Sequence, residues 1–339
     1  MAHSLKVAER SEIHIGSAAE LLPALLPDGR VIVITDANID RRQHHLLNGL
    51  EFIMIGTGES IKTLHTAETI YRRFVELGID RSCFVLGIGG GIVTDITGFV
   101  ASTYMRGLRF GFISTTLLGQ VDASVGGKNG VNLDGYKNMV GTFNQPQFVI
   151  CDPTLLGTLP EREFRAGLAE IVKAGIIADS DLFERIEHSS FDELRHNHDL
   201  LGEIILAAIK VKADIVDRDE RESGERRKLN LGHTFAHAIE KLSTEMNHGE
   251  AVAAGTTLAA RLAVKLGTLT PEDAERIERV LSSLGFTLTS PVPVKRLVSA
   301  ISKDKKSDGN AIHFVLPTGI GECEVRRMTI EEIASLVEA

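Results

Sequence analysis

Three histidines in the segment from Arg226 to Val252 have the spacing of a metal site. His233 and His237 are four residues apart, and His248 comes directly before Gly249. Residues four apart lie on one face of an α-helix, so both imidazoles of the pair could converge on one ion. Neutral imidazole is the commonest side-chain metal ligand, and an ion needs more than two ligands. The alternative is a pair of surface or capping histidines that bind no metal.

A second segment, GLAEIVKAG, offers a carboxylate for the same ion. Its helical pattern carries Glu170, with Lys173 one turn later. Before the paired histidines, Asn230–Leu231–Gly232 interrupts an otherwise helical stretch, and glycine allows a backbone or a ligand to approach closely. We therefore expect the two segments to form the wall of a metal-dependent active site.

The run LGIGGGIVTD predicts a glycine-rich turn between a strand and a helix, where amide groups at the helix N-terminus favour a phosphate. The third glycine of a GxGxxG motif falls on Ile92, so the run indicates a variant pyrophosphate loop or a tight structural turn. Asp36 ends another strand and could accept a ribose hydroxyl or cap a helix. Glu59 and Lys62, in GESIKT, have the same two interpretations.

The segment Asp122–Gly141 is too rich in glycine and polar residues for a helix or a core strand, so we expect a loop. It offers Asp122, Lys128, Lys137 and Asn138, and lysines beside glycines suit a phosphate. A solvated loop would also be polar, but it would not require two glycines directly before a lysine.

Basic residues precede the histidine segment at Arg226, Arg227 and Lys228, with Lys212 upstream. They form either a solvated helix face or, because Arg226 and Asn230 are four apart, a fork for a substrate carboxylate. SKDKKSDG (302–309) is expected to be a surface turn.

Strands alternate with helical patterns in the first half, which predicts βαβ units and a mostly parallel sheet with ligands beyond the carboxyl ends of its strands. The strands are expected at Val31–Asp36, Phe52–Gly56, Cys83–Gly91, Arg109–Thr116 and Gln147–Asp152. After about Thr154 helices dominate, at Glu161–Ala178, Leu200–Val216, Leu231–Ser243, Glu250–Leu266 and Pro271–Leu284, with one hairpin of IHFVLPTG and ECEVRRM near the end. The expected fold is α/β, with a boundary near Leu159–Pro160 and an active site in the cleft between the halves.

The 339 residues carry a net charge of −9, which argues against a general nucleic-acid binder. Cys83, Cys151 and Cys323 are far apart and have no CxxC spacing, as expected of reduced packing thiols. The start, MAHSLKVAERSEIHIG, has no apolar core for a signal peptide, and no window reaches the roughly 18 apolar residues of a membrane span. We expect a cytoplasmic protein with neither a membrane nor a nucleic acid as partner.

Several long motifs together resemble the 3-dehydroquinate synthases of the sugar phosphate cyclase superfamily. They are GGGIVTDITGF, TTLLGQVDASVGGK, GYKNMVGTFNQP, LPEREFRAGLAEIVK, LNLGHTFAHAIE and HGEAV, spread over nearly the whole chain. The resemblance implies a Rossmann-like NAD-binding α/β domain (1–159), followed by a mainly α-helical metal- and substrate-binding domain (160–339). It also implies the second step of the shikimate pathway. There, 3-deoxy-D-arabino-heptulosonate 7-phosphate becomes 3-dehydroquinate and phosphate, and NAD is regenerated in each turnover.

The resemblance also implies one divalent metal ion, zinc or cobalt, held by Glu170, His233 and His248, which makes His237 a substrate-side group instead of a ligand. It implies a homodimer in which Arg106 reaches the phosphate of the neighbouring subunit. NAD contacts map to Asp36, Glu59, Lys62, Gly90, Gly91, Ile92, Asp95, Thr115, Thr116, Leu118, Lys137, Asn138, Thr158, Leu159 and Glu163. Substrate groups map to Arg106, Asp122, Lys128, Asn138, Lys173, Lys212, Arg226, Asn230, His237 and Lys305.

One departure is a tyrosine before Lys137, where many relatives have a longer run containing histidine. Two other enzyme classes share part of the pattern. A sister cyclase making valiolone or deoxy-inosose precursors binds a substrate without a carboxylate, so it would not need Lys212, Arg226 and Asn230 to bind one. A metal-dependent polyol dehydrogenase would consume NAD stoichiometrically. A dinucleotide sensor without catalysis would have no need of the metal triad.

Overall fold

The β-branched runs of the first half form a seven-stranded sheet in which all pairs but one are parallel. The computed structural model describes residues 3–304 and 311–338. Within it, the chain divides into two compact units, the first comprising Met1–Pro160 and His198–Asp217 and the second the remainder. The sheet order is β1-β2-β9-β6-β5-β3-β4, and β1 pairs antiparallel with β2. The strands are β1 (His3–Val7), β2 (Ser11–Ile15), β3 (Val31–Asp36), β4 (Glu51–Ile55), β5 (Phe84–Gly89), β6 (Arg109–Ser114) and β9 (Phe148–Cys151).

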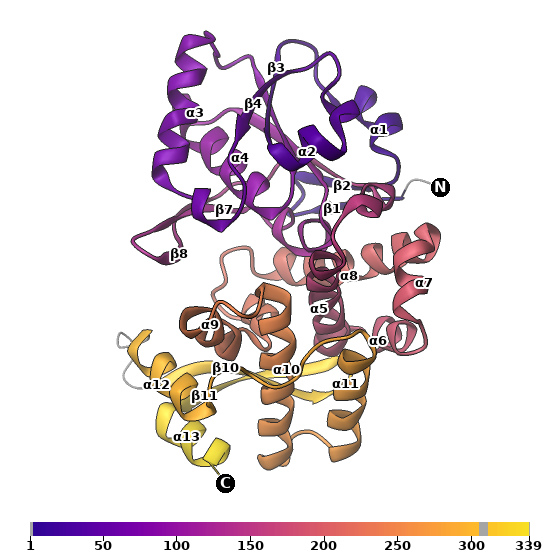
Figure 1. Cartoon of the computed structure of the whole chain (residues 1–339), viewed down its shortest axis with the longest axis vertical. Helices are drawn as coiled ribbons and strands as arrows, with labels where there is room; N and C mark the ends of the chain where they lie inside the picture. Colours follow the sequence, from indigo (N-terminus) through magenta and orange to yellow (C-terminus); the bar gives the residue numbers. More distant parts are fainter. Residues whose placement is uncertain (1–2, 305–310, 339) are drawn as a thin grey trace. The chain divides into compact units, whose positions relative to one another are not determined.

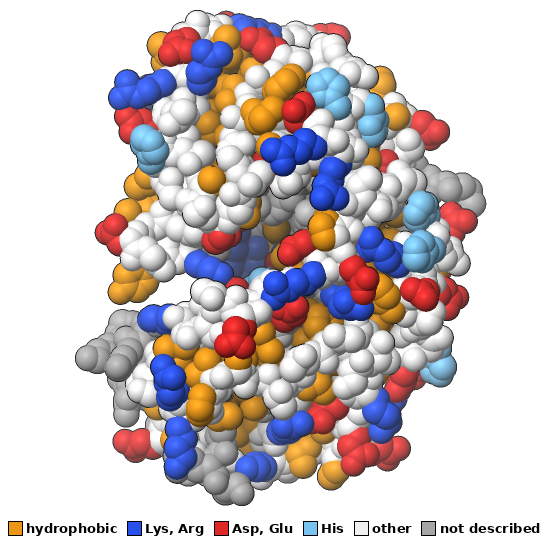
Figure 2. Space-filling model, in the orientation of Figure 1, with side chains coloured by type: hydrophobic (Ala, Val, Ile, Leu, Met, Phe, Trp, Pro, Cys, Tyr) orange, Lys and Arg blue, Asp and Glu red, His pale blue; other side chains and the backbone are white. Residues whose placement is uncertain are grey.

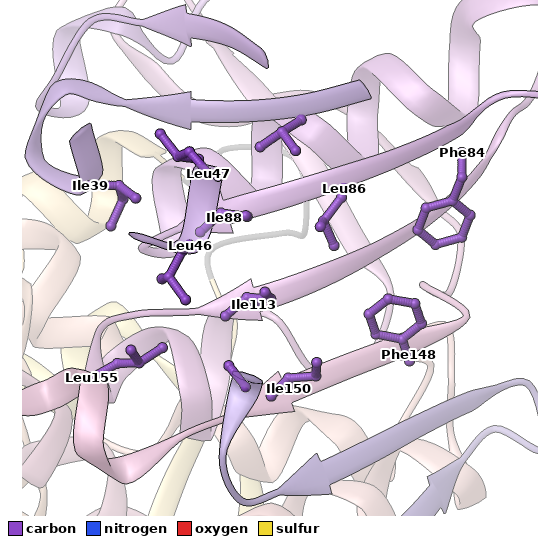
Figure 3. Close-up of a cluster of buried hydrophobic side chains, with 12 residues drawn as sticks. Ile39, Leu46, Leu47, Phe84, Leu86, Ile88, Ile113, Phe148, Ile150 and Leu155 are labelled. Atoms are coloured by element: carbon purple, nitrogen blue, oxygen red, sulfur yellow. The ribbon is translucent and has the colours of Figure 1, made fainter. Parts of the chain in front are cut away.

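Helices cover both faces of this sheet, because successive side chains of each strand point to opposite faces. Leu86 and Ile88 of β5 pack with Ile113 and Ile150 under α1, α2 and the turn after it (Figure 3). On the other face, a Cβ atom on Gly87 would lie 2.9 Å from Thr97 of α4. Figure 1 shows α3 and α1 on opposite sides of the strands. The helices of this unit are α1 (Ala18–Leu25), α2 (Ala37–Arg42), α3 (Leu64–Glu76), α4 (Gly91–Thr103) and α8 (His198–Arg218).

Helix α8 belongs to the first unit, although it follows three helices of the second along the chain. A Cβ atom on its Gly202 would lie 3.7 Å from Pro153 and 3.8 Å from Ile15, both in the first unit. The sequence pattern predicted the helix but not the unit to which it belongs.

The segment Asp122–Gly141 is not the loop that its composition suggested, and this prediction was wrong. After a short π-helical turn (Gly119–Ala123), β7 (Lys128–Leu133) and β8 (Tyr136–Phe143) form an antiparallel hairpin. Its turn is Asp134–Gly135, both with positive φ (49° and 82°). Asp-Gly favours the two-residue type I′ turn, because that backbone twist matches the twist of the strands. The signal LDGY was therefore present in the sequence.

The second unit is mainly helical, as expected, and the closing hairpin is confirmed as β10 (Ala311–Gly319) paired with β11 (Glu322–Thr329). In Figure 1, α10 and α11 run side by side and β10 passes beside α10. The five predicted helices differ by no more than two residues at either end from α5, α8, α9, α10 and α11. The helices of this unit are α5 (Glu161–Ala178), α6 (Ser180–Glu187), α7 (Phe191–His196), α9 (His233–Leu242), α10 (His248–Lys265), α11 (Pro271–Ser283), α12 (Val294–Asp304) and α13 (Ile330–Glu338).

The surface carries both signs of charge. Acidic and basic side chains are interspersed over the face shown in Figure 2, so they do not gather there into one basic patch of the kind that binds nucleic acid. Among the described residues, none of the helices combines the length and the apolar run that crossing a bilayer requires. The three cysteines are free and buried.

Candidate metal centre and dinucleotide site

Three helices of the second unit bring one carboxylate and two imidazoles together. Glu170 comes from the middle of α5, while His233 and His248 are the first residues of α9 and α10. Their ligand atoms all lie within 4.8 Å of one another. Glu170 Oε1 is 3.6 Å from His233 Nε2 and 3.4 Å from His248 Nε2. The predicted ligand set is therefore one spatial group.

The close approach of α10 to its neighbours depends on two glycines. A Cβ atom on Gly249 would lie 2.2 Å from Ala166 Cα of α5, and one on Gly232 would lie 2.5 Å from Thr256 Oγ1 of α10. Gly232 also has φ +77°, which a residue with a Cβ adopts only at a cost. It ends the preceding turn and is the N-cap of α9, so the helix begins at His233 and not at Leu231.

Each histidine is fixed by the way its helix begins. His233 Nδ1 lies 3.1 Å from the Leu231 carbonyl oxygen, which leaves Nε2 directed at Glu170. His248 follows the N-cap Asn247, and the Asn247 and Glu250 side chains each accept from the other's backbone amide. This capping box holds the first turn of α10, and Arg162 of α5 donates to the same Glu250 carboxylate at 2.6 Å.

Buried charges set the protonation states of the triad. Burial alone would raise the pKa of Glu170, but Lys173 and the two imidazoles outweigh it and hold that pKa well below its usual range. Burial, and after it Lys173, lowers the pKa of His233 to about 3, so this ring is neutral at pH 7. Burial also opposes the charge on His248, yet hydrogen bonding with Glu170 and Glu240 raises its pKa to about 9. His248 must therefore release a proton when a cation binds.

These residues fit a divalent metal ion of the zinc type. Two ligands at about 2.0–2.2 Å from a tetrahedral zinc stand roughly 3.3–3.6 Å apart, which matches both nitrogen–oxygen separations. Both Glu170 oxygens are buried: Oε2 forms an ion pair with the Lys173 ammonium, and Oε1 faces the two imidazoles. A buried carboxylate that faces two imidazoles is suited to a cation.

The spacing of His233 and His237 by itself suggested two ligands of one ion, and the structure does not group them in this way. The His237 ring lies beside that of His233, with ring centroids 5.4 Å apart, but the ligand group consists of His233, His248 and Glu170.

One residue beside the metal ligands was not predicted from the sequence. Glu240, seven residues after His233 on α9, lies 3.3 Å from His248 Nδ1. Its place on the face of α9 that carries His233 and His237 was a signal that could have found it.

In the first unit, several of the predicted nucleotide residues lie at or just after the carboxyl ends of β3, β5 and β6, where the sheet topology reverses. From β3 the chain continues to β4 on one side, and then to β5 and β6 on the other. Ligands of doubly wound sheets bind at such a switch point, beyond the carboxyl ends of the strands. Asp36 ends β3, and the neighbouring strand β5 leads into α4. The N-cap of α4 is Gly90, so the N-cap has no side chain that could cap the first amides of the helix. The α4 amides there are suited to a phosphate.

Asp36 is engaged as a helix cap. Its Oδ1 accepts from the amides of Asn38 at 2.8 Å and Ile39 at 3.2 Å, so the capping interpretation describes its position in the structure. Its role toward a ribose stays a prediction. Thr115 and Thr116 follow β6, and Leu118 comes two residues later. Thr158 and Leu159 end the turn after β9, where the Thr158 carbonyl accepts from Arg42 at 2.8 Å.

A polar network connects four of the predicted nucleotide residues. It includes one further residue, Asn132, which the sequence analysis did not indicate. Lys62, buried, donates to Asp95 and to Asn138 Oδ1. Asn132 joins Glu59 at 2.7 Å to the Asn138 amide at 2.9 Å. Burial raises the pKa of Asp95 to about 6, although the Lys62 ammonium acts to lower it. At pH 7 the carboxylate is ionised and paired.

The predicted substrate groups fall into separate clusters. In the first unit, Lys212 of α8 donates to the carbonyl oxygen of Asp122 at 2.6 Å and to its Oδ1 at 2.5 Å. In the second unit, Arg226 and Asn230 lie in the short helix Glu225–Asn230. Arg226 is only 2% exposed and donates to the Glu220 carbonyl.

The loop before this short helix is organised around Asp219. Its carboxylate accepts from the amides of Ser223, Gly224 and Arg226. These bonds, that from Gly224 first, hold the pKa of Asp219 well below its usual range. Asn230 donates to Glu222 Oε1 at 2.6 Å. These hydrogen bonds therefore fix the backbone of the loop that leads into the short helix with Arg226 and Asn230, the residues predicted to bind the substrate carboxylate.

Four other predicted residues, Arg106, Lys128, Lys137 and Glu163, are exposed. Arg106 has a positive φ of 68°, Lys128 begins β7, and Glu163 lies in the first turn of α5. Lys305, and with it most of SKDKKSDG, lies outside the described residues, whereas Ser302 lies in α12.

Comparison with known proteins identifies relatives along nearly the whole chain. A family model described as 3-dehydroquinate synthase N-terminal matches residues 52–166, and one described as 3-dehydroquinate synthase C-terminal matches 167–307. The 3-dehydroquinate synthase of Rippkaea orientalis is 42% identical over 290 residues, covering 84% of this chain and 79% of that protein. The synthase of a Synechococcus species is 39% identical over 326 residues, covering 91% and 89%.

Solved structures of two cyclases are also similar. The 2-epi-5-epi-valiolone synthase from Streptomyces hygroscopicus, with NAD+ and Zn2+ bound, has a TM-score of 0.87 and 28% identity, covering 97% of this chain and 95% of that one. A 2-deoxy-scyllo-inosose synthase complexed with carbaglucose-6-phosphate, NAD+ and Co2+ has a TM-score of 0.84, with 99% of each chain covered. Its 23% identity shows a shared fold. Since the two family models together span residues 52–307 and the synthases align over most of their length, the chain belongs to the 3-dehydroquinate synthase family of enzymes.

Proposed function

We propose that this protein is a 3-dehydroquinate synthase, which converts 3-deoxy-D-arabino-heptulosonate 7-phosphate to 3-dehydroquinate and phosphate. The reaction makes it a phosphorus–oxygen lyase and places it in the shikimate pathway. One observation carries the proposal: a buried carboxylate and two imidazoles have their ligand atoms within 4.8 Å of one another, in a chain of this family. The buried free cysteines fit a reducing compartment, so we place the enzyme in the cytoplasm.

The proposed metal ligands are Glu170, His233 and His248, and the proposed ion is zinc or cobalt. When bound, the ion would polarise a substrate hydroxyl, and NAD would supply a reversible hydride acceptor. The NAD site is assigned to the switch point of the sheet, with the α4 N-terminus for the pyrophosphate. The network of Lys62, Asp95 and Asn138 would hold the side of the nucleotide. The valiolone synthase, solved with NAD+ and Zn2+, supports this pairing of cofactors.

The chain's own groups would bind the two anionic ends of the substrate. We assign the carboxylate to Arg226, Asn230 and Lys212, because a buried guanidinium and a buried ammonium can each offset negative charge. We assign the phosphate to Lys128, Asn138, Arg106 and Lys305, the last of which lies outside the described residues. His237, Asp122 and Lys173 would hold the reacting hydroxyls and relay protons. The pairs Lys173–Glu170 and Lys212–Asp122 keep these groups ordered before the substrate arrives.

We propose a homodimer in which Arg106 serves the neighbouring subunit. Arg106 is exposed and held by a strained backbone, since it and Met105 both have positive φ (68° and 48°). Large apolar side chains of the same unit are also exposed: on β8, Met139 is 58% exposed and Phe143 is 50% exposed. Exposed apolar surface of this kind is typical of interfaces.

The test supplies the heptulosonate phosphate with zinc and a trace of NAD and follows both phosphate and NADH. A synthase releases phosphate in many-fold excess over NAD and accumulates no NADH. Sustained NADH formation from a polyol, without phosphate release, would mean a dehydrogenase. Phosphate release from a sugar phosphate without a carboxylate, such as glucose 6-phosphate, and none from the heptulosonate would mean a sister cyclase. Chelation should stop turnover, and zinc or cobalt should restore it.

A further inference from the structure

Glu240 is placed on α9 where it can act on a proposed metal ligand of α10. It lies three residues after His237 and seven after His233, on the same face of the helix. Its Oε1 is 3.3 Å from His248 Nδ1, and its side chain is only 10% exposed. The opposite ring nitrogen, Nε2, faces Glu170 Oε1 at 3.4 Å. The imidazole of His248 therefore lies between two carboxylates from two other helices.

We propose that Glu240 is a positioning residue of the metal site, which orients His248 and increases the affinity for the ion. An imidazole binds a metal through one nitrogen, and the partner of the other nitrogen fixes the tautomer and the ring orientation. A proton on Nδ1 donated to Glu240 leaves the Nε2 lone pair directed to the ion. His233 is held in the same sense, with Nδ1 at 3.1 Å from the Leu231 carbonyl oxygen. Both rings thus present Nε2 on the side of Glu170.

The charges of the site give Glu240 a second effect. A divalent ion together with Lys173 would bring three positive charges beside the single negative charge of Glu170. Uncompensated charge is costly in a buried site. The carboxylate of Glu240 lowers that excess by one, which the neutral Leu231 carbonyl on the His233 side cannot do. Glu240 is therefore expected to act through both orientation and charge.

A purely structural role predicts something different. The contact also connects α9 to the first turn of α10, so its loss could lower the stability of the protein with no effect on the ion. Two variants separate the alternatives. Glu240→Ala removes both orientation and charge, whereas Glu240→Gln keeps an oxygen that can accept from Nδ1 and removes only the charge. Glu278→Gln is the matched control, because it removes a carboxylate of the same unit that pairs with Arg261 and not with a histidine.

The experiment measures the zinc dissociation constant of the full chain by competition with a chromophoric chelator, alongside thermal unfolding of the metal-free proteins. We expect Glu240→Ala to weaken zinc binding by about 10–100-fold, the usual loss for such outer partners, Glu240→Gln to weaken it less, and Glu278→Gln to leave it unchanged. The visible absorption bands of the cobalt-loaded protein should shift in Glu240→Ala. Zinc affinities within about twofold of the wild type in both Glu240 variants would overturn the proposal, even if unfolding temperatures fall. The inference rests on the proposed metal site, and the two failures differ: a wild-type chain that binds no zinc refutes the site itself.

Discussion

Gly249 of α10 lies so close to Ala166 of α5 that a Cβ atom on the glycine would stand 2.2 Å from the Ala166 Cα. The obstacle is backbone, which cannot rotate away as a side-chain end can. His248 immediately precedes this glycine, and Glu170 follows Ala166 by four residues on the same face of α5. The contact therefore sets the separation of two proposed ligands.

Gly249→Ala is expected to push α10 away from α5 and so to affect both stability and the metal. Overpacking of this kind costs about 1–3 kcal/mol, and the zinc dissociation constant should rise with it because His248 moves. Urea unfolding and zinc competition measure the two effects. Gly319→Ala serves as control, since a Cβ there would meet nothing within 4 Å. A Gly249→Ala protein with unchanged stability would show that the two helices need not lie this close.

His233→Ala and His237→Ala are expected to separate a ligand from its neighbour on the same helix. Replacement of His233 removes one of three ligands, so zinc affinity should fall by more than the roughly 100-fold upper range of an outer partner. Replacement of His237 should leave zinc binding within a few-fold of the wild type and lower the turnover number. Chelator competition and the phosphate-release assay check both. Equal losses of zinc in the two variants would restore the HxxxH pair as the ligand set.

Asp95→Asn is expected to remove one pH-dependent part of the stability. The pKa of Asp95 is raised from 3.8 to about 6 by burial, with Glu59 and Asp122 adding to the rise and Lys62 opposing it. A carboxyl group whose pKa is higher in the folded than in the unfolded chain favours the fold at a pH below its unfolded pKa of 3.8. This contribution is lost as the pH rises through the folded pKa of about 6.

The wild type minus variant difference in unfolding free energy should therefore fall between about pH 4 and pH 7, by at most about 3 kcal/mol. Urea unfolding at several pH values measures it, with Asp134→Asn in the exposed hairpin turn as control. A difference that stays constant over this range would mean that Asp95 titrates as an ordinary exposed carboxyl.

Lys128→Ala and Lys137→Ala compare two exposed lysines of the β7–β8 hairpin. If Lys128 binds the departing phosphate, its loss should lower the turnover number by about 100-fold or more and leave NAD affinity near normal. Lys137→Ala should instead weaken NAD. Steady-state kinetics and NAD titration by fluorescence distinguish the two. A comparable loss of NAD binding in Lys128→Ala would count against its phosphate role.

The order of strands and helices could be predicted because periodicity is local. The run at Val31–Asp36 and the helix at Glu161–Ala178 each carry their pattern within one element, so their ends agree closely with the structure. The hairpin of β7 and β8 was missed because glycines and polar residues suppress the apolar alternation of a strand, although the Asp134–Gly135 turn was visible in the sequence. The pairing of β1 with β2 also gave no apolar signal, since the pattern HSLKV is mixed.

Contacts between elements were harder to predict, because they depend on packing that one sequence does not contain. The spacing of His233 and His237 indicated a metal, but which histidine faces Glu170 is decided by where α10 approaches α5. The resemblance to the family identified His248 as the second histidine ligand. The structure explains this choice, because Gly249 allows α10 to approach α5 closely. Asn132 contacts Glu59, 73 positions away in the sequence, so no local pattern marked it. Glu240 lies only eight residues before its partner His248, and helical periodicity could have marked it.

The most direct measurement is anomalous X-ray scattering at the zinc absorption edge from crystals of the full chain grown with zinc. We predict one strong peak in each chain at about 2.0–2.2 Å from a Glu170 carboxylate oxygen, His233 Nε2 and His248 Nε2. A peak held by His233 and His237, or no peak beside Glu170 at saturating zinc, would contradict it.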